Sequence, residues 1–171
     1  MQLNIRTLGV KDARLLIALR REALETEPLA FAASPADDVA LVMESVHSFL
    51  EKPDTQAVYG SFDRADLVGM IGLFKHTKMK QRHKAAIWGM YVQPGFRRRG
   101  VGRALLAAAI DHARTWSVDQ LQLSVTESAV AAKQLYEAAG FRAWGAEPRA
   151  LQWNERFMEE HHLALDLSNS A

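Results

Sequence analysis

Two glycines and a group of arginines gather in one short stretch of this chain. Gly100 and Gly102 lie where an apolar pattern with helical spacing begins. The arginines around them are Arg97, Arg98, Arg99 and Arg103. The first amides of a helix have no partner within the helix, and they carry the positive end of its dipole. Because glycine lets a phosphate approach the backbone closely, this stretch predicts a pyrophosphate site.

The elements predicted on either side of the glycines suit a phosphate-binding turn, which we call the cradle. Residues 85–92 are mostly apolar and predict a buried strand, and a helix is expected from about Gly100 to Thr115. A P-loop is excluded, because Val101 and Gly102 replace its lysine and hydroxyl residue. A Rossmann fingerprint is excluded, because Leu105 fills the position of its third glycine. A plain connection from strand to helix remains the alternative.

The pattern that remains is Arg97-x-x-Gly100-x-Gly102. It resembles the Gln/Arg-x-x-Gly-x-Gly/Ala signature of the GNAT superfamily of N-acetyltransferases, which holds the pyrophosphate of acetyl-CoA. Residues 135–141, Leu-Tyr-Glu-Ala-Ala-Gly-Phe, resemble a second segment of that superfamily. The resemblance covers about residues 55–145, and the first part of the chain matches only in its outline of one strand and two helices.

The resemblance assigns expected roles to individual residues. For the pyrophosphate it implies backbone amides of Arg98, Arg99, Gly100, Val101, Gly102 and Arg103. For the pantetheine it implies backbone groups of Met90, Tyr91 and Val92. The arginine side chains, Arg97 included, either contact acetyl-CoA, with one of them reaching the 3′-phosphate, or are simply solvated.

Tyr136 is the expected catalytic residue. The superfamily places this tyrosine near the thioester sulfur, as a general acid or as a hydrogen-bond donor to the thiolate. A packing role in the core is the alternative. Ala129 occupies a position where relatives often carry an asparagine, and Ser128 is the candidate replacement for its contacts with acetyl-CoA.

The general base is harder to assign. Residues 85–92 contain no Asp or Glu, although many relatives use a carboxylate on that strand. Glu127 is the first candidate, His76 or His83 the second, and a water molecule without a single protein partner is the alternative.

Composition limits the other functions. A chain of 171 residues is most simply one domain, residues 1–171, and its net charge of +1 favours neither nucleic acid nor a membrane as partner. Without cysteine there is no disulfide, no thiolate metal site and no cysteine nucleophile. The adjacent pair His161-His162 lacks a third ligand, so we expect no metal. The absence of a signal-like apolar start and of any long apolar run favours a cytoplasmic protein.

The order of predicted elements is β-α-α-β-β-β-α-β-α-β-β. It begins with a strand near residues 3–5, a helix capped by Asp12, and a helix starting at Ser34-Pro35. Strands follow at 57–62 and 67–74, joined as a hairpin, and at 121–125; Ser128 is expected to cap a helix that Gly140 ends, before strands at 141–144 and 163–167. This is an α/β (α+β) class with a mixed sheet and helices on both faces. The resemblance narrows it to the GNAT fold, a mostly antiparallel sheet with splayed fourth and fifth strands.

The predicted function is transfer of acetyl from acetyl-CoA to a primary amine of a small molecule or peptide, by direct attack in a ternary complex. A non-catalytic acyl-CoA sensor or regulatory module is the alternative. The basic stretch 75–84 either attracts an acidic acceptor or is a solvated loop. Residues 29–34 with Trp88, Trp144 and Trp153 either line an acceptor wall or belong to the core. A homodimer is a further expectation, through an edge strand at 163–167.

Overall fold

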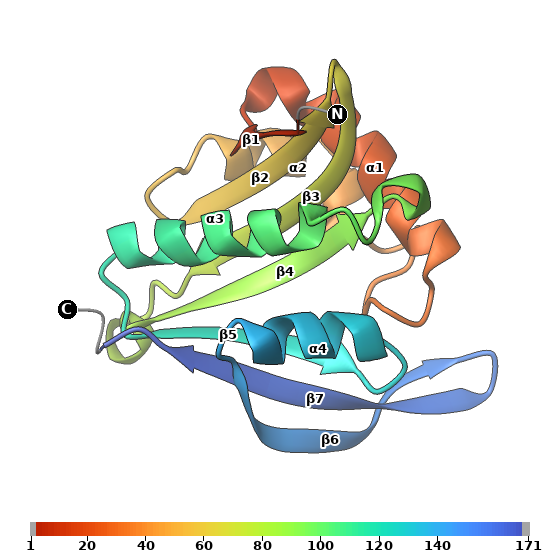
Figure 1. Cartoon of the computed structure of the whole chain (residues 1–171), viewed down its shortest axis with the longest axis vertical. Coiled ribbons are helices and arrows are strands. Elements are labelled where there is room, and N and C mark those ends of the chain that lie inside the picture. The colour runs from red at the N-terminus through yellow and green to blue at the C-terminus, as the bar shows by residue number, and fades with distance from the viewer. Residues whose placement is uncertain (1–2, 169–171) are drawn as a thin grey trace.

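The computed structural model describes residues 3–168, so the outermost residues of the predicted 1–171 domain, 1–2 and 169–171, lie outside the described part. Within it, seven strands form one sheet in the order β1-β2-β3-β4-β5-β7-β6 (Figure 1). Only β4 and β5 pair in parallel, and all other neighbours are antiparallel. The mixed, mostly antiparallel sheet predicted from the sequence is therefore confirmed.

We call residues 97–102, which contain Gly100 and Gly102, the glycine turn. The elements before it are β1 (Leu3–Thr7), α1 (Ala13–Thr26), α2 (Met43–Leu50), β2 (Gln56–Asp63), β3 (Asp66–Lys75) and β4 (Lys84–Val92). After it come α3 (Val101–Thr115), β5 (Gln120–Thr126), α4 (Val130–Ala138), β6 (Arg142–Trp153) and β7 (Arg156–Asp166). No helix within residues 3–168 has the length and apolar character needed to cross a membrane.

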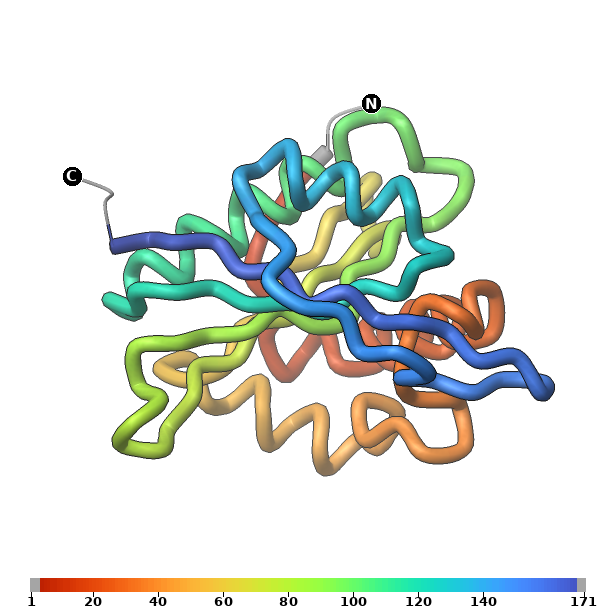
Figure 2. Tube along the Cα trace, turned by 90° about the horizontal axis from the view of Figure 1, so that it is seen from below, coloured from red at the N-terminus to blue at the C-terminus, as the bar shows by residue number. Residues whose placement is uncertain are grey.

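Helices cover both faces of the sheet, as Figure 2 shows from below. On one face, Leu16 of α1 and Val46 of α2 share a buried cluster with Met70 of β3. On the other face, Leu105 of α3 and Tyr136 of α4 share a cluster with the next residue of β3, Ile71. Successive strand residues point to opposite faces, so one strand supplies both cores.

The parallel pair β4–β5 is short, and it opens into a gap. The two strands pair only where Lys84–Ala86 meets Gln120–Gln122, and both continue well beyond that point. A bulge at Gly89, which has a φ of +64°, adds a residue to β4 between its pairings with Gly72 and Met70 of β3. The predicted splay of the fourth and fifth strands is confirmed, and it leaves one edge of β4 without a partner strand.

The second helix begins later than predicted. Ser34 and Pro35 start a turn, in which the Ser34 amide donates to the Asp37 carboxylate at 2.6 Å, and α2 begins only at Met43. Between them, Asp38 caps a single 3₁₀ turn by accepting from the Ala40 amide at 2.7 Å. A serine followed by a proline suits the start of a turn as well as that of a helix, so the pattern did not separate the two.

Neither predicted cap residue makes a side-chain hydrogen bond to the first turn of its helix. Asp12 does precede α1, but its carboxylate accepts from Arg6 and from the Gly9 amide. Ala129 is the residue that precedes α4, and the hydroxyl of Ser128 lies 3.1 Å from that of Thr126 instead of capping the helix. Gly140, with a φ of +99°, ends α4 as predicted.

The last two strands form a hairpin much longer than the predicted segments 141–144 and 163–167. Because β7 lies between β5 and β6, Leu163 and Ala164 pair on both sides, and the prediction of an edge strand is wrong for them. Leu165 and Asp166 pair with β5 alone, because β6 begins at Arg142, opposite Ala164. Among the described strands the edges are β1 and β6. The hairpin passes beside the segment after α1 (Figure 2). Phe31 of that segment and Trp153 of the hairpin line a common hollow.

Candidate active site

The glycine turn has the geometry of an anion cradle. Gly100 adopts a φ of +82° at the N-cap of α3, and a Cβ there would meet nothing within 4 Å. Ala104 donates to the Gly100 carbonyl at 3.0 Å and closes the first turn of the helix. Within the described residues, the amides of Gly100, Val101, Gly102 and Arg103 make no hydrogen bond. Four donors at the positive end of a 15-residue helix therefore face outward together.

Gly102 serves a different purpose from the one its motif suggests. A Cβ on it would lie 3.1 Å from the Met90 methyl and 3.3 Å from Leu135 Cδ2. The missing side chain therefore faces protein atoms, and it lets α3 pack closely against β4 and α4. Only the amide of Gly102 is left for the cradle.

The four arginines of the turn differ in their surroundings. Arg97 donates to the Val92 carbonyl at 2.9 Å and pairs with Glu27 at 2.8 Å, so its side chain ties the turn to β4 and to the end of α1. The guanidinium of Arg99 lies 5.7 Å from the centre of the Phe96 ring. Arg98 and Arg103 are exposed, and Arg98 has a φ of +61°.

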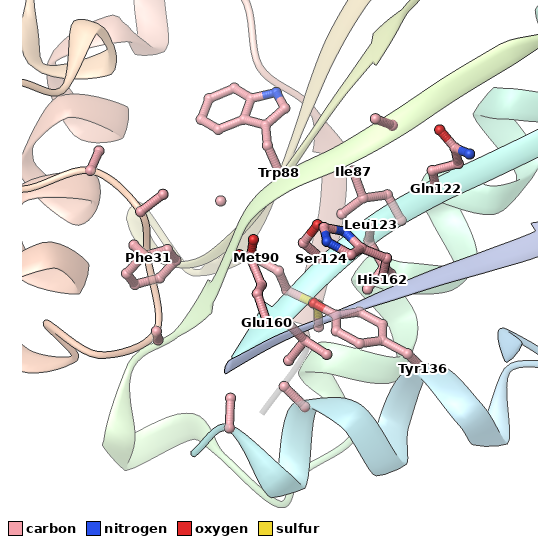
Figure 3. A pocket seen from close by; sticks show the side chains of 18 of the residues that line it. Phe31, Ile87, Trp88, Met90, Gln122, Leu123, Ser124, Tyr136, Glu160 and His162 are labelled. Atoms are coloured by element: carbon pink, nitrogen blue, oxygen red, sulfur yellow. The ribbon is translucent and has the colours of Figure 1, made fainter. Parts of the chain in front are cut away.

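A cavity of about 510 Å³ occupies the gap between β4 and β5. On the side of α3 and α4 it is lined by Met90, Leu123, Val125, Ala129 and Tyr136. It also reaches Phe31 in the segment after α1, and Trp88 and Ser124 on the opposite side of the two strands (Figure 3). One continuous space therefore touches both faces of the sheet.

Tyr136 points from α4 into this cavity. Its ring packs against Phe141, and its hydroxyl donates to the Met90 sulfur at 3.3 Å (Figure 3). Burial raises the pKa of the phenol, so the hydroxyl keeps its proton near neutral pH. Among the residues that the structure describes, the partner of this hydroxyl is a thioether, which is a weak acceptor, so the hydroxyl is available to donate to a stronger acceptor such as a thiolate.

The other predicted residues are distributed unevenly around this cavity. The backbone of Met90, Tyr91 and Val92 follows the bulge, on the part of β4 that has left β5. The side chain of Tyr91 turns the other way, and its hydroxyl donates to Glu22 at 2.9 Å. Ser128 is exposed and does not line the cavity, whereas Ala129 does.

The candidate bases also separate. Glu127 is exposed outside the cavity lining, and its carboxylate accepts from the Glu159 amide at 3.2 Å. His83 is exposed as well. His76 lines the cavity, and burial, followed by the charges of Lys84 and His83, lowers its pKa.

The carboxylate that lines the cavity is Glu160 of β7, which the sequence pattern did not predict. Burial, reinforced by the charge of Glu147 and opposed by that of His162, raises the pKa of Glu160. His162 also lines the cavity, with Nδ1 2.8 Å from the Ser124 hydroxyl and its ring stacked on Trp144. The strand predicted at 163–167 begins just after Glu160 and His162, so it included neither residue.

The fold gives His162 the neighbours that the sequence did not indicate. Ligand atoms of Glu147, Glu160 and His162 lie within 4.8 Å of one another. His161, on the opposite face, pairs with Glu159 at 2.9 Å, in agreement with the expected alternation. The expectation of no metal at this pair stays a prediction, although its argument from a missing third ligand no longer holds.

The predicted aromatic wall forms in part. Residues Ala30–Ala33, Trp88 and Trp144 line the cavity, and Trp153 lines the neighbouring hollow. Gly72 allows Trp88 to lie across β3, because a Cβ there would overlap the indole ring. The ring of Phe49 packs edge-on against that indole, with the two ring centres 5.7 Å apart.

Known proteins resemble this chain at the level of both sequence and fold. A mycothiol acetyltransferase of Thermobispora bispora is 35% identical over 48% of this chain and 30% of its own length. A ribosomal protein bS18-alanine N-acetyltransferase of Salmonella typhimurium is 45% identical over 34% of this chain and 39% of its own length. The matches therefore span less than half of either relative.

A solved structure extends the likeness to nearly the whole chain. The YncA protein of Salmonella typhimurium, described as an acetyltransferase and solved with its cofactor acetyl-CoA, matches with a TM-score of 0.85. The match is 19% identical and covers 99% of this chain and 96% of that one, so it shows a shared fold. The sequence profile of the acetyltransferase (GNAT) family matches residues 17–141, which include the glycine turn, the splayed strands and Tyr136. This chain belongs to the acetyltransferase (GNAT) family.

Proposed function

We propose that this protein transfers the acetyl group of acetyl-CoA to a primary amine, by direct attack while both are bound. The observation that carries the proposal is the cavity between β4 and β5, which touches both faces of the sheet. Such a space lets a thioester and an amine approach one another from opposite sides. Holding the two in place supplies much of the acceleration in a reaction of two molecules.

The residues on the side of α3 and α4 suit acetyl-CoA. The amides of Gly100–Arg103 offer donors for a pyrophosphate, and the unpaired edge of β4 beyond Ala86 offers backbone groups for the pantetheine. Acetyl-CoA supplies the activated acetyl group as a thioester. Tyr136 would then lie beside the sulfur, because the partner of its buried hydroxyl within residues 3–168 is the weakly accepting Met90 sulfur.

The transfer moves one acyl group and one proton. A bond forms between the amine nitrogen and the acetyl carbon, the carbon–sulfur bond breaks, and the proton lost by the nitrogen balances the one gained by the thiolate. Tyr136 donates a hydrogen bond to the departing sulfur. Because the chain contains no cysteine, no thiol of the protein carries the acetyl group in between.

Glu160 is the group we propose to accept the proton of the amine, in place of Glu127. It lines the cavity, and the raised pKa of its carboxyl makes it a stronger base than an ordinary carboxylate. His162 and Ser124, 2.8 Å apart, lie on the same wall and are able to pass the proton onward.

The test measures the release of CoA from acetyl-CoA across a panel of amino acids, polyamines, aminoglycosides and peptide N-termini. A thiol reagent reads this release without background from the protein, since the chain has no cysteine. The proposal predicts release that depends on both the enzyme and the amine, together with equal amounts of acetylated amine by mass spectrometry. Tight binding of acetyl-CoA by calorimetry, with no release for any amine, would instead support the non-catalytic module.

A further inference from the structure

One arginine in the wall of this cavity is fixed in place with a donor to spare. Arg20 of α1 is only 5% exposed, and it lines the cavity. Its Nε and Nη2 atoms lie 2.7 Å and 2.6 Å from the same oxygen of Asp38, which is buried as well. The other oxygen of Asp38 accepts from the Ala40 amide at 2.7 Å. Two aromatic rings flank the guanidinium, with centres 4.6 Å away for Phe31 and 5.9 Å for Trp88.

The remaining nitrogen, Nη1, is buried without a hydrogen-bond partner among the described residues. It lies 3.5 Å from where a Cβ on Gly89 would stand. Gly89 is the bulge residue of β4, and it lines the cavity too. An unsatisfied buried donor on a charged group is costly, and such groups are rare in native proteins. A donor kept at that cost at the wall of a binding cavity indicates an acceptor that arrives with a ligand.

The opposite wall carries the complementary charge. Glu160 and His162 line the cavity from β7, and Glu147 lies 3.5 Å from the far nitrogen of His162. A cationic amine suits this wall, whereas an anionic oxygen suits Nη1 of Arg20. The space between them is lined by apolar side chains, including Phe31, Trp88 and Met90.

We infer that the acceptor is a free amino acid, whose carboxylate accepts a hydrogen bond from Nη1 of Arg20 while the amine faces Glu160. This inference rests on the proposed function and names its substrate class. The fixed fork of Arg20 restricts where the carboxylate can lie, and that places the amine toward the gap between β4 and β5. A cavity of about 510 Å³ that must also hold the acetyl end of acetyl-CoA favours a small acceptor.

The first test uses the native protein and three matched acceptors: phenylalanine, phenylalaninamide and phenethylamine. They share a side chain and differ in whether the amine neighbours a carboxylate, an amide or neither. Rates of CoA release are compared per fraction of neutral amine, because the three amines differ in pKa. We expect kcat/KM for phenylalanine to exceed that of the other two by at least tenfold, mainly through KM, and the same order for an aliphatic set built on leucine. Equal or higher values for the amide and the amine would overturn the inference, while no release with any amine would count against the proposed function itself.

The second test assigns the carboxylate to Arg20. Replacing Arg20 alone would leave Asp38 buried and unpaired, so the variant is the double substitution Arg20→Gln with Asp38→Asn, which keeps the pair neutral. We expect it to bind acetyl-CoA as the native protein does and to lose its preference for the free acid over the amide. A folded double variant with an unchanged preference would show that Arg20 is structural and that the carboxylate is held elsewhere. If the double variant does not fold, the acceptor series with the native protein decides the inference by itself.

Discussion

Removing the hydroxyl of Tyr136 tests the chemistry of the cavity with the smallest change. Tyr136→Phe keeps the ring that packs against Phe141 and deletes only the donor to the Met90 sulfur. A thioether is a weak acceptor, so the lost bond contributes at most about 1 kcal/mol to the free energy of unfolding. For a chain of this size that lowers the melting temperature by roughly 2–4 °C. Acetyl-CoA affinity should not change, because the contact with sulfur strengthens only as the carbon–sulfur bond breaks.

The expected loss in kcat follows from the protonation state of the phenol. Burial raises its pKa above 10, whereas a thiol has a pKa near 8.5, so full proton transfer to the thiolate is unfavourable. The role that remains is a hydrogen bond to a charged sulfur, which contributes about 1.5–3 kcal/mol. This corresponds to a decrease in kcat of roughly 10- to 150-fold.

The assay is steady-state release of CoA with acetyl-CoA and amine varied independently, so that kcat and KM separate. Tyr59→Phe is the matched control, because the Tyr59 hydroxyl bonds His112 at 2.9 Å and the residue does not line the cavity. A native kcat in Tyr136→Phe would refute the reasoning and make Tyr136 a packing residue. An equal loss in Tyr59→Phe would mean that the effect is not specific to the cavity.

Three further predictions concern the base, the cradle and the fold. Glu160→Gln should lower kcat/KM by about 10²–10⁴-fold and remove the fall in rate that the native enzyme shows as pH drops through the raised pKa of Glu160. Glu127→Gln should leave kcat/KM and its pH dependence unchanged. The reverse result would make Glu127 the base. Arg103→Pro removes one cradle amide from the first turn of α3, where helices tolerate proline. Acetyl-CoA affinity measured by calorimetry should fall roughly 10- to 150-fold, and further than in Arg103→Ala, which keeps the amide. Equal affinities of the two variants would exclude that amide from the site. The hydrogen bonds from Arg6 lower the pKa of the Asp12 carboxyl, so their stabilisation is present above the pKa of Asp12 in the unfolded chain and is lost as pH falls through its pKa in the folded chain. Asp12→Asn should therefore lower the melting temperature at pH 7 and make the melting temperature less dependent on pH in the acid range. An unchanged dependence on pH would contradict this.

The sequence predicted the parts of the site that follow strong local patterns. Gly100 marks the start of α3 because the turn before the helix has a positive φ there, Gly102 follows in the first turn of the helix, and the apolar run at 85–92 identifies β4. In the second motif, Tyr136 lines the cavity and Gly140 adopts the positive φ expected at the end of the helix. Local patterning therefore located the side of the cavity that suits acetyl-CoA.

The other side of the cavity depends on contacts that no local pattern records. Most of β6 is exposed, so its sequence lacks the apolar–polar alternation that indicates a half-buried strand. The sequence therefore predicted too short a hairpin, and it missed the part that brings Glu147 beside Glu160. Arg20 looks like any polar residue of an amphipathic helix until Asp38, eighteen positions away, pairs with it in the interior. This wall of the cavity, where we propose that the acceptor binds, is thus assembled from distant segments by tertiary packing.

We propose that acetyl-CoA binds along the unpaired edge of β4 and meets the amine in the gap beside β5. A crystal structure of the protein with bound CoA tests this most directly. We expect pyrophosphate oxygens on the amides of Gly100–Arg103 and the sulfur within hydrogen-bond distance of the Tyr136 hydroxyl. CoA bound at another surface, or a sulfur beyond the reach of Tyr136, would contradict it.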